Sequence, residues 1–392
     1  MAYLLIIIGL LYLEAAVLTN QLNAHDHVDH YNRIDDDRRI WGYVAETDHT
    51  NKSSVQQGTE PSGTRSAKKH PCPSKISNPK TTDFTALGRR ISETKCYEYI
   101  LELKYRDDKA KSAGRRSPRN TGRGLFKPSV IGGRDTAPSE FPHMGAIGWA
   151  GVTETWVFKC GSSLISSKFV LTAAHCSRAS ERDTTIADTL PKIVRLGTKN
   201  LMLYAGRPPV DAKIVNILVH PQYSSPKRYY DIALMELEAA VTFSKHLQPA
   251  CLWTDPDTNL GKATVTGWGV AQQGSQRIYP ELQAAEIDLI ETETCDRLLR
   301  SSCDRNWCGV QDHQICGGVL AGGVDTCHGD SGGPLQVKIP IPLTSQGNMH
   351  HVIGVTSFGA LRCARPNVPG VYTRVFSFLD WIETNVWSNC TS

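Results

Sequence analysis

The chain has 392 residues, with 43 Lys and Arg against 39 Asp and Glu and a formal net charge of +4. This length accommodates one large domain or two ordinary ones, and the near-balance of charge argues against a dedicated nucleic-acid binder. Twelve cysteines fit an oxidising compartment better than the cytosol, and none lies in a Cys-x-x-Cys pair, which argues against structural zinc.

The chain begins with a short apolar run at residues 4–13, followed by Glu14-Ala15-Ala16. A bilayer-spanning helix needs about 20 apolar residues, so we interpret residues 1–19 as a signal peptide. No second long apolar run appears, and we expect a secreted, extracellular protein without a membrane span. Asn51 and Asn389 begin Asn-x-Ser/Thr sequons and are potential glycosylation sites.

Residues 20–129 contain little that would build a hydrophobic core, and we interpret them as a pro-segment that is largely disordered. Residues 61–129 are basic, with 17 Lys and Arg against 6 Asp and Glu, which favours a solvated linker over a specific polyanion site. One short helix is expected at Ile91–Leu101, with Ser92 as its cap.

From residue 130 to residue 392, short runs rich in Val, Ile and Leu alternate with turn residues. This pattern is typical of an all-β barrel or sandwich. Near the end, apolar residues at 378, 379, 382 and 386 have helical spacing, which predicts a closing C-terminal helix.

Three short motifs carry the chemistry. They are Thr-Ala-Ala-His-Cys at 172–176, Asp-Ile-Ala-Leu at 231–234, and Asp-Thr-Cys-His-Gly-Asp-Ser-Gly-Gly-Pro at 325–334. A serine hydroxyl becomes a nucleophile when a histidine takes its proton and a buried carboxylate orients that histidine. Singly, His175 is as well explained as a structural histidine and Asp231 as a strand-end acid. Together with Ser331, in this order, they predict a catalytic triad.

These motifs resemble those of trypsin- and chymotrypsin-like serine proteases, over about Val130 to Trp387. The resemblance implies two packed six-stranded antiparallel β-barrels with a C-terminal helix. It also implies an oxyanion hole from the backbone N–H groups of Gly329 and Ser331. Asp325 would form the floor of a specificity pocket for Arg or Lys, with small residues at Gly359 and Gly370 leaving room for the long side chain.

The resemblance also implies activation by cleavage. Val130-Ile131-Gly132-Gly133 is similar to the new N-terminus of an activated zymogen, whose amine would pair with Asp330. The residue before the cut is Ser129, and Pro128 disfavours cleavage after Lys127. We therefore expect an upstream protease that accepts a small residue.

The segment around residues 91–99 resembles the linker of arthropod clip-domain (snake-like) proteases, although Cys72 alone precedes it where that family has a six-cysteine clip module. The clip module is thus missing or degenerate. The resemblance implies the disulfides Cys160–Cys176, Cys295–Cys316, Cys327–Cys363 and Cys96–Cys251, the last tethering the processed light chain. Cys303 and Cys308 are candidates for a local staple, and the pairing of Cys72 and Cys390 stays open.

The leading hypothesis is a secreted trypsin-like endopeptidase in an extracellular proteolytic cascade serving immunity, melanisation or development. Its expected partners are protein substrates, the activating protease and a serpin-type inhibitor. The alternatives are a digestive trypsin and a non-catalytic homologue that binds partners. We expect no cofactor and no metal, because the loop at 197–207 lacks the carboxylates that calcium prefers.

Overall fold

The computed structural model describes residues 88–113, 133–153, 155–202, 208–257, 260–269, 280–322, 330–341, 344–359 and 365–388. Apart from 180–183, these residues belong to one compact unit, Gly58–Ala179 and Thr184–Ser392. The predicted signal peptide, both sequons and the predicted cleavage site lie outside the described residues. Among the described helices, none is long and apolar enough to cross a membrane.

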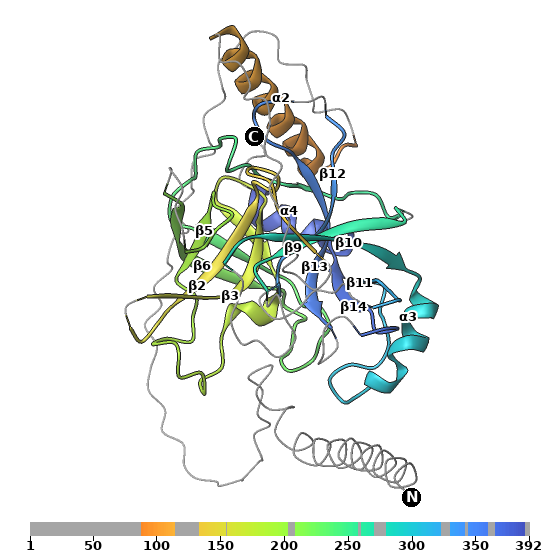
Figure 1. The fold of residues 1–392 in the computed structure, drawn as a ribbon. Coiled ribbons are helices and arrows are strands. Elements are labelled where there is room, and N and C mark those ends of the chain that lie inside the picture. The colour runs from red at the N-terminus through yellow and green to blue at the C-terminus, as the bar shows by residue number, and fades with distance from the viewer. Residues whose placement is uncertain are drawn as a thin grey trace, which may run out of the picture. The chain divides into compact units, whose positions relative to one another are not determined.

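The first half of the unit is a closed barrel of six antiparallel strands in the order β2-β3-β4-β7-β6-β5 (Figure 1). The strands are β2 (Met144–Ala150), β3 (Trp156–Leu164), β4 (Phe169–Thr172), β5 (Ile193–Leu196), β6 (Val210–Val219) and β7 (Ala233–Leu237). Their inward side chains are mainly Ile, Leu and Val, whose branched shapes suit a pleated surface, and they form one buried cluster.

The second half is another closed barrel, in the order β9-β10-β11-β14-β13-β12, with β12 returning to β9. Its strands are β9 (Lys262–Gly267), β10 (Gln283–Ile290), β11 (Gln314–Gly318), β12 (Pro334–Lys338), β13 (His350–Phe358) and β14 (Gly370–Arg374). Two short strands extend it, β1 (Arg134–Asp135) beside β10 and β8 (Cys251–Leu252) parallel to β13. The predicted pair of packed six-stranded barrels is confirmed.

Short helices connect or close the barrels. They are η1 (Ala174–Ser177), α3 (Thr292–Leu299), η2 (Arg300–Ser302), η3 (Val375–Phe378) and α4 (Leu379–Trp387). The expected C-terminal helix is confirmed as η3 followed by α4. Leu379, Ile382 and Trp387 of α4 are buried in the cluster of the first barrel. The C-terminal helix is therefore fixed against the first barrel, although it follows the second along the chain.

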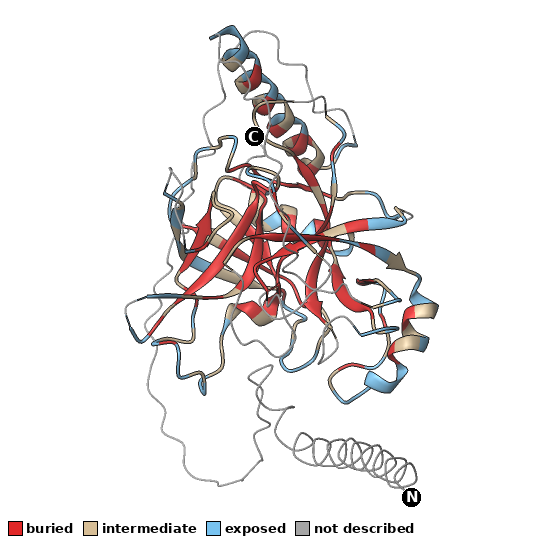
Figure 2. Ribbon diagram, in the orientation of Figure 1, coloured by how far each residue is buried: buried red, intermediate tan, exposed pale blue. Residues whose placement is uncertain are grey.

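Helix α2 (Ile91–Ser112) precedes the barrels and is twice the expected length. Ser92 lies inside its first turn and is not the cap, because its hydroxyl donates to Glu383 of α4 at 2.5 Å. Cys96, Tyr99 and Leu103 recur at helical spacing and are buried, so one face of α2 is an interior face. Figure 2 shows this alternation of buried and exposed residues along the helix.

Polar contacts fix both ends of α2. Arg90, just before the helix, pairs with Glu383 at 3.0 Å and with Asp380. Near the other end, the buried Asp107 accepts hydrogen bonds from the backbone N–H and hydroxyl of Ser345, at 2.8 and 2.7 Å. Helix α2 is therefore an integral layer of the fold.

Four disulfides lie within the described residues. They are Cys96–Cys251, Cys160–Cys176, Cys295–Cys316 and Cys303–Cys308. The first three confirm pairings implied by the family resemblance, and the fourth confirms the local staple. Cys327–Cys363, Cys72 and Cys390 lie outside the described residues.

Candidate active site

His175 sits on η1, the 3₁₀ turn that follows β4. The neighbouring Cys176 bonds to Cys160 of β3 and anchors this turn to the barrel wall. Asp231 holds His175 through both carboxylate oxygens. Oδ1 accepts from the backbone N–H of His175 at 2.9 Å, and Oδ2 lies 2.8 Å from Nδ1. This two-point contact fixes the position and orientation of the imidazole.

Asp231 is 3% exposed and lies just before β7. The hydroxyl of Ser357, on β13 of the second barrel, donates to Oδ2, and Thr373 donates to the Asp231 carbonyl at 2.8 Å. Burial by itself raises the pKa of Asp231, but the His175 ring, the Ser357 hydroxyl and the His175 backbone N–H outweigh it and hold the pKa below its usual value. The carboxylate is thus ionised at neutral pH.

Ser331 lies on a tight turn that contacts both barrels. Its carbonyl accepts from Gly161 of β3 at 2.8 Å, and Gly332 donates to Thr356 of β13 at 2.8 Å. Gly332 has φ +76°, and a Cβ there would lie 2.6 Å from the Gly161 carbonyl oxygen. Only glycine fits this close approach without strain.

The Ser331 turn and the His175–Asp231 pair meet at the seam between the barrels. Cys176 Sγ lies 3.7 Å from the Ser331 carbonyl oxygen and within 4.8 Å of a ring nitrogen of His175. Thr356, which binds the turn, directly precedes Ser357, which binds Asp231. The structure therefore brings the three residues predicted as a triad to one place.

Asp330, directly before Ser331, is 5% exposed and rests on two glycines. Its Oδ1 accepts from the backbone N–H of Gly269 at 2.9 Å. A Cβ at Gly269 would lie 2.5 Å from Oδ2, and one at Gly267 would overlap Oδ1. The side chain of Asp330 is thus cradled by backbone that tolerates no added carbon. Ser129 and Val130, the predicted cleavage site, lie outside the described residues.

Two of the predicted specificity residues are described. Gly359 follows the end of β13, and a Cβ there would meet nothing within 4 Å. Gly370 begins β14, and a Cβ there would lie 3.2 Å from the Tyr372 hydroxyl. Asp325 and Gly329, predicted for the pocket floor and the oxyanion hole, lie outside the described residues.

Three groups at this site were not predicted from the sequence. They are Ser357, the glycine pair at 267 and 269, and Arg228, whose guanidinium carbon lies 5.0 Å from the centre of the Phe358 ring. Ser357 stands two positions before Gly359, a predicted pocket residue, but nothing in the sequence indicates its contact with Asp231. The others act through contacts between segments that are far apart in the sequence.

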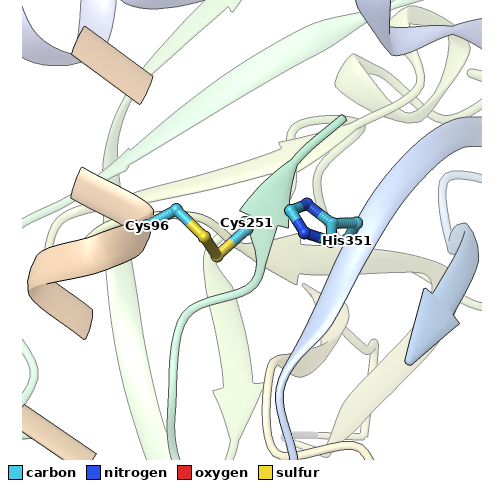
Figure 3. Close-up of side chains that lie close together, drawn as sticks. All are labelled: Cys96, Cys251 and His351. Carbon is cyan, nitrogen blue, oxygen red and sulfur yellow. A yellow bond between two sulfur atoms is a disulfide. The ribbon is translucent and has the colours of Figure 1, made fainter. Parts of the chain in front are cut away.

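Two groups of metal-ligating residue types occur among the described residues. In each, a histidine lies beside a disulfide: His351 near Cys96–Cys251 and His175 near Cys160–Cys176. Figure 3 shows the first, with Cys96 on α2, Cys251 on β8 and His351 on β13. Metal ligation by cysteine uses the thiolate, and both sulfurs are consumed in the disulfide. The donor sets do not fit a metal ion.

Comparison with known proteins gives the family. The trypsin family model matches residues 130–382. Serine protease snk of Drosophila melanogaster is 37% identical over 308 residues, covering 77% of this chain and 66% of its own length. CLIP domain-containing serine protease B10 of Anopheles gambiae is 36% identical over 274 residues, covering 66% and 69%.

Among solved structures, mouse neuropsin, a serine protease expressed in the limbic system of the brain, matches with a TM-score of 0.51. It is 26% identical and covers 64% of this chain and 98% of its own. The chain spans just under two thirds of the length of snk. These matches confirm the predicted likeness to trypsin-like and clip-domain proteases.

Proposed function

The chain belongs to the trypsin family of serine proteases, and on this premise we propose that it is the secreted zymogen of a trypsin-like endopeptidase. Its substrates are extracellular proteins cut after Arg or Lys, within a proteolytic cascade such as those of immunity, melanisation or development. The two-point contact between Asp231 and His175 carries the proposal, because it prepares a histidine to act as a general base.

In the proposed reaction, Asp231 fixes the proton on Nδ1 of His175, which leaves Nε2 as the basic nitrogen. Nε2 takes the proton of the Ser331 hydroxyl as Oγ attacks the substrate carbonyl carbon. The resulting imidazolium, stabilised by the ionised Asp231, returns the proton to the leaving amine as the peptide C–N bond breaks. Water then attacks the carbonyl carbon of the acyl-enzyme while Nε2 of His175 takes a proton from it. The imidazolium returns this proton to Oγ as the ester bond breaks, which restores Ser331.

The backbone N–H groups of Gly329 and Ser331 would bind the oxyanion, and each such donor is worth about 2.7–4 kcal/mol of transition-state stabilisation. Asp325 would pair with the Arg or Lys side chain of the substrate, because a buried carboxylate requires a cationic partner. The open space at Gly359 supports this part of the proposal, since a long side chain needs an unobstructed wall.

Activation would occur by cleavage between Ser129 and Val130, after which the new amine pairs with Asp330. The glycine cradle supports this role, because it holds the Asp330 carboxylate in a buried position beside Ser331. An enzyme specific for Arg or Lys does not cut after Ser129. The activator is therefore a different protease, which places this one downstream in a cascade, and a serpin-type inhibitor would regulate it.

The digestive alternative is disfavoured by the docked light-chain helix α2 and its disulfide to β8. The non-catalytic alternative is disfavoured by the presence of the nucleophile Ser331, which such homologues usually lack.

The decisive experiment separates catalysis from activation. Residues 125–129 are replaced by the Asp-Asp-Asp-Asp-Lys recognition sequence of a site-specific protease, so that cleavage occurs directly before Val130. We expect the cut protein to react with a labelled fluorophosphonate and to hydrolyse peptides after Arg and Lys. Cut Ser331→Ala protein should do neither. Equal hydrolysis after Phe and Arg, or activity in the Ser331→Ala protein, would contradict the proposal.

A second experiment tests the activation step. The unaltered zymogen, incubated with the active enzyme prepared above, should remain uncut between Ser129 and Val130 by N-terminal sequencing. A protease preferring small residues should produce the Val130 terminus and activity together. Rapid self-cleavage at this bond would exclude a separate activator.

A further inference from the structure

A small disulfide-closed loop packs against the segment that leads into Asp231. Cys303 and Cys308 are five residues apart and close the 303–308 loop. The loop binds the segment at residues 228–229 through two hydrogen bonds. The N–H of Arg228 donates to the Asn306 carbonyl at 3.1 Å, and the N–H of Cys308 donates to the Tyr229 hydroxyl at 2.9 Å. The loop thus fixes the backbone on which Arg228 stands.

The side chain of Arg228 lies over the ring of Phe358, which stands between Ser357 and the predicted pocket residue Gly359. Its guanidinium carbon lies 5.0 Å from the centre of the Phe358 ring, in a cation–π contact. Trp307 meets the same ring at 5.3 Å in a T-shaped arrangement. Phe358 itself is only 7% exposed. The Arg228 side chain over this ring is 28% exposed, so its cation is accessible to solvent.

Arg228 stands close to the reacting groups on both sides. It lies three residues before Asp231, and the ring it covers belongs to the residue after Ser357, whose hydroxyl binds Asp231. Gly359, a proposed pocket wall, comes next. Under the proposed function, in which the Arg or Lys side chain of a substrate binds beside Gly359, we expect the residues before the scissile bond to lie near Phe358 and Arg228.

Among the residues that the structure describes, the charge of Arg228 has only a weak partner. Its nearest described carboxylate is Asp304 of the 303–308 loop, at 3.6 Å, and the two side chains are 28% and 44% exposed. At this exposure an ion pair contributes little, typically under about 1 kcal/mol. The oxygen that faces Arg228 is Oδ2. The other oxygen of Asp304, Oδ1, accepts hydrogen bonds from the N–H groups of Asn306 and Trp307, at 2.7 and 2.9 Å. A substrate carboxylate can therefore compete for the guanidinium.

We propose that Arg228 is a specificity-determining residue that favours substrates carrying Asp or Glu within three residues before the cleaved Arg or Lys. The inference rests on the proposed endopeptidase function and extends it to the neighbouring substrate positions. The planar guanidinium binds a carboxylate through two parallel N–H groups, whereas an amide of the same shape gains only one ordinary hydrogen bond.

The test uses the protease cut before Val130 and pairs of fluorogenic peptides that end in Arg. The members of each pair differ only by Glu or Gln at one of the three preceding positions. At one of these positions, kcat/KM for Glu should exceed that for Gln by about three- to tenfold at low salt. The ratio should fall as ionic strength rises, because the pair is partly exposed.

Two variants should move the ratio in opposite directions. Arg228→Gln removes the cation and should bring the Glu/Gln ratio to about one, while increasing cleavage of peptides with Phe at that position as the Phe358 ring becomes exposed. Asp304→Asn keeps the oxygen that caps the loop but removes the competing charge, and it should raise the ratio. Arg305→Ala, an exposed arginine on the same loop, is the charge-matched control and should leave it unchanged.

The outcomes are distinguishable. Hydrolysis after Arg without a Glu preference at any of the three positions, or a preference that persists in Arg228→Gln, overturns the role of Arg228 and leaves the proposed function intact. A larger effect from Arg305→Ala than from Arg228→Gln also overturns it. Failure to hydrolyse any Arg peptide, with no fluorophosphonate labelling, overturns the proposed function itself.

Discussion

Gly267 and Gly269 surround the Asp330 carboxylate so closely that adding one methyl group should lower the activity strongly while the protein stays folded. In Gly269→Ala, the new Cβ would lie 2.5 Å from Oδ2, 2.7 Å from Cγ and 2.8 Å from Oδ1 of Asp330. Contacts this short oblige the buried carboxylate to move, and it then loses the Gly269 N–H bond, now 2.9 Å. A hydrogen bond to a charged group contributes about 1.5–3 kcal/mol.

Because Asp330 directly precedes Ser331, we expect this loss to appear in the assembly of the oxyanion site. If the whole free energy of this hydrogen bond is lost from transition-state stabilisation, kcat/KM falls about 10- to 150-fold. The assay is hydrolysis of an Arg peptide after cleavage before Val130, with the unfolding free energy measured in urea on the same samples. The fall should be mostly in kcat.

The matched control is Gly261→Ala at the start of β9. Gly261 has φ +66°, and a Cβ there meets nothing within 4 Å. The substitution strains the backbone by about 1–2 kcal/mol but touches no part of the site, so it should lower stability and spare activity. Full activity in Gly269→Ala, or an equal loss of activity in Gly261→Ala, would refute the reasoning.

Three further predictions concern stability, each measured by urea unfolding. Burial lowers the pKa of His143 to about 4, and burial also lowers that of His350 beside it. Between about pH 6.5 and 4 the unfolded chain protonates His143 and the folded chain excludes that proton, so His143 should lower the unfolding free energy by about 1.4 kcal/mol for each unit of falling pH. Burial of His350 acts in the same direction. His143→Asn should flatten this fall. Replacing Cys96 and Cys251 by Ser should cost about 2–5 kcal/mol, as expected for a cross-link between distant residues. Leu103→Ala, at a fully buried position of α2, should cost about 2–5 kcal/mol through the cavity it leaves.

Each of these predictions has a result that would contradict it. A pH profile unchanged by His143→Asn would show that this histidine does not lose its proton on folding. Unchanged stability in the double cysteine variant or in Leu103→Ala would show that α2 is not part of the cooperative fold. Ala→Gly at the exposed Ala113, beyond the helix, is the control for both.

The β-barrels and the proposed triad could be predicted from the sequence because both leave local patterns in it. Short Val- and Ile-rich runs are readable as strands, and His175, Asp231 and Ser331 lie in distinctive motifs. The contact that orients His175 was foreseeable, but the hydroxyl of Ser357 was not. Its partner is 126 residues away, and a serine in a strand carries no local sign of that contact.

The second half of helix α2 is an element that the sequence did not predict. This half, from Glu102 to Ser112, is mostly charged, and this composition predicts disorder. It is helical because Leu103 inserts among buried residues of the protease unit and Asp107 accepts two hydrogen bonds from Ser345. Tertiary contacts decide the structure where propensity does not.

The cluster under α2 has a practical consequence. Cys96, Tyr99 and Leu103 supply half of it, and Cys251, Ile339 and Met349 from the barrel side supply the rest. A recombinant protease domain that starts at Val130 would lose the first three and present the others to water as an apolar patch beside an unpaired thiol. Such patches promote self-association. Preparations of the two barrels should therefore begin before Gly88, because helix α2 supplies one wall of their interior.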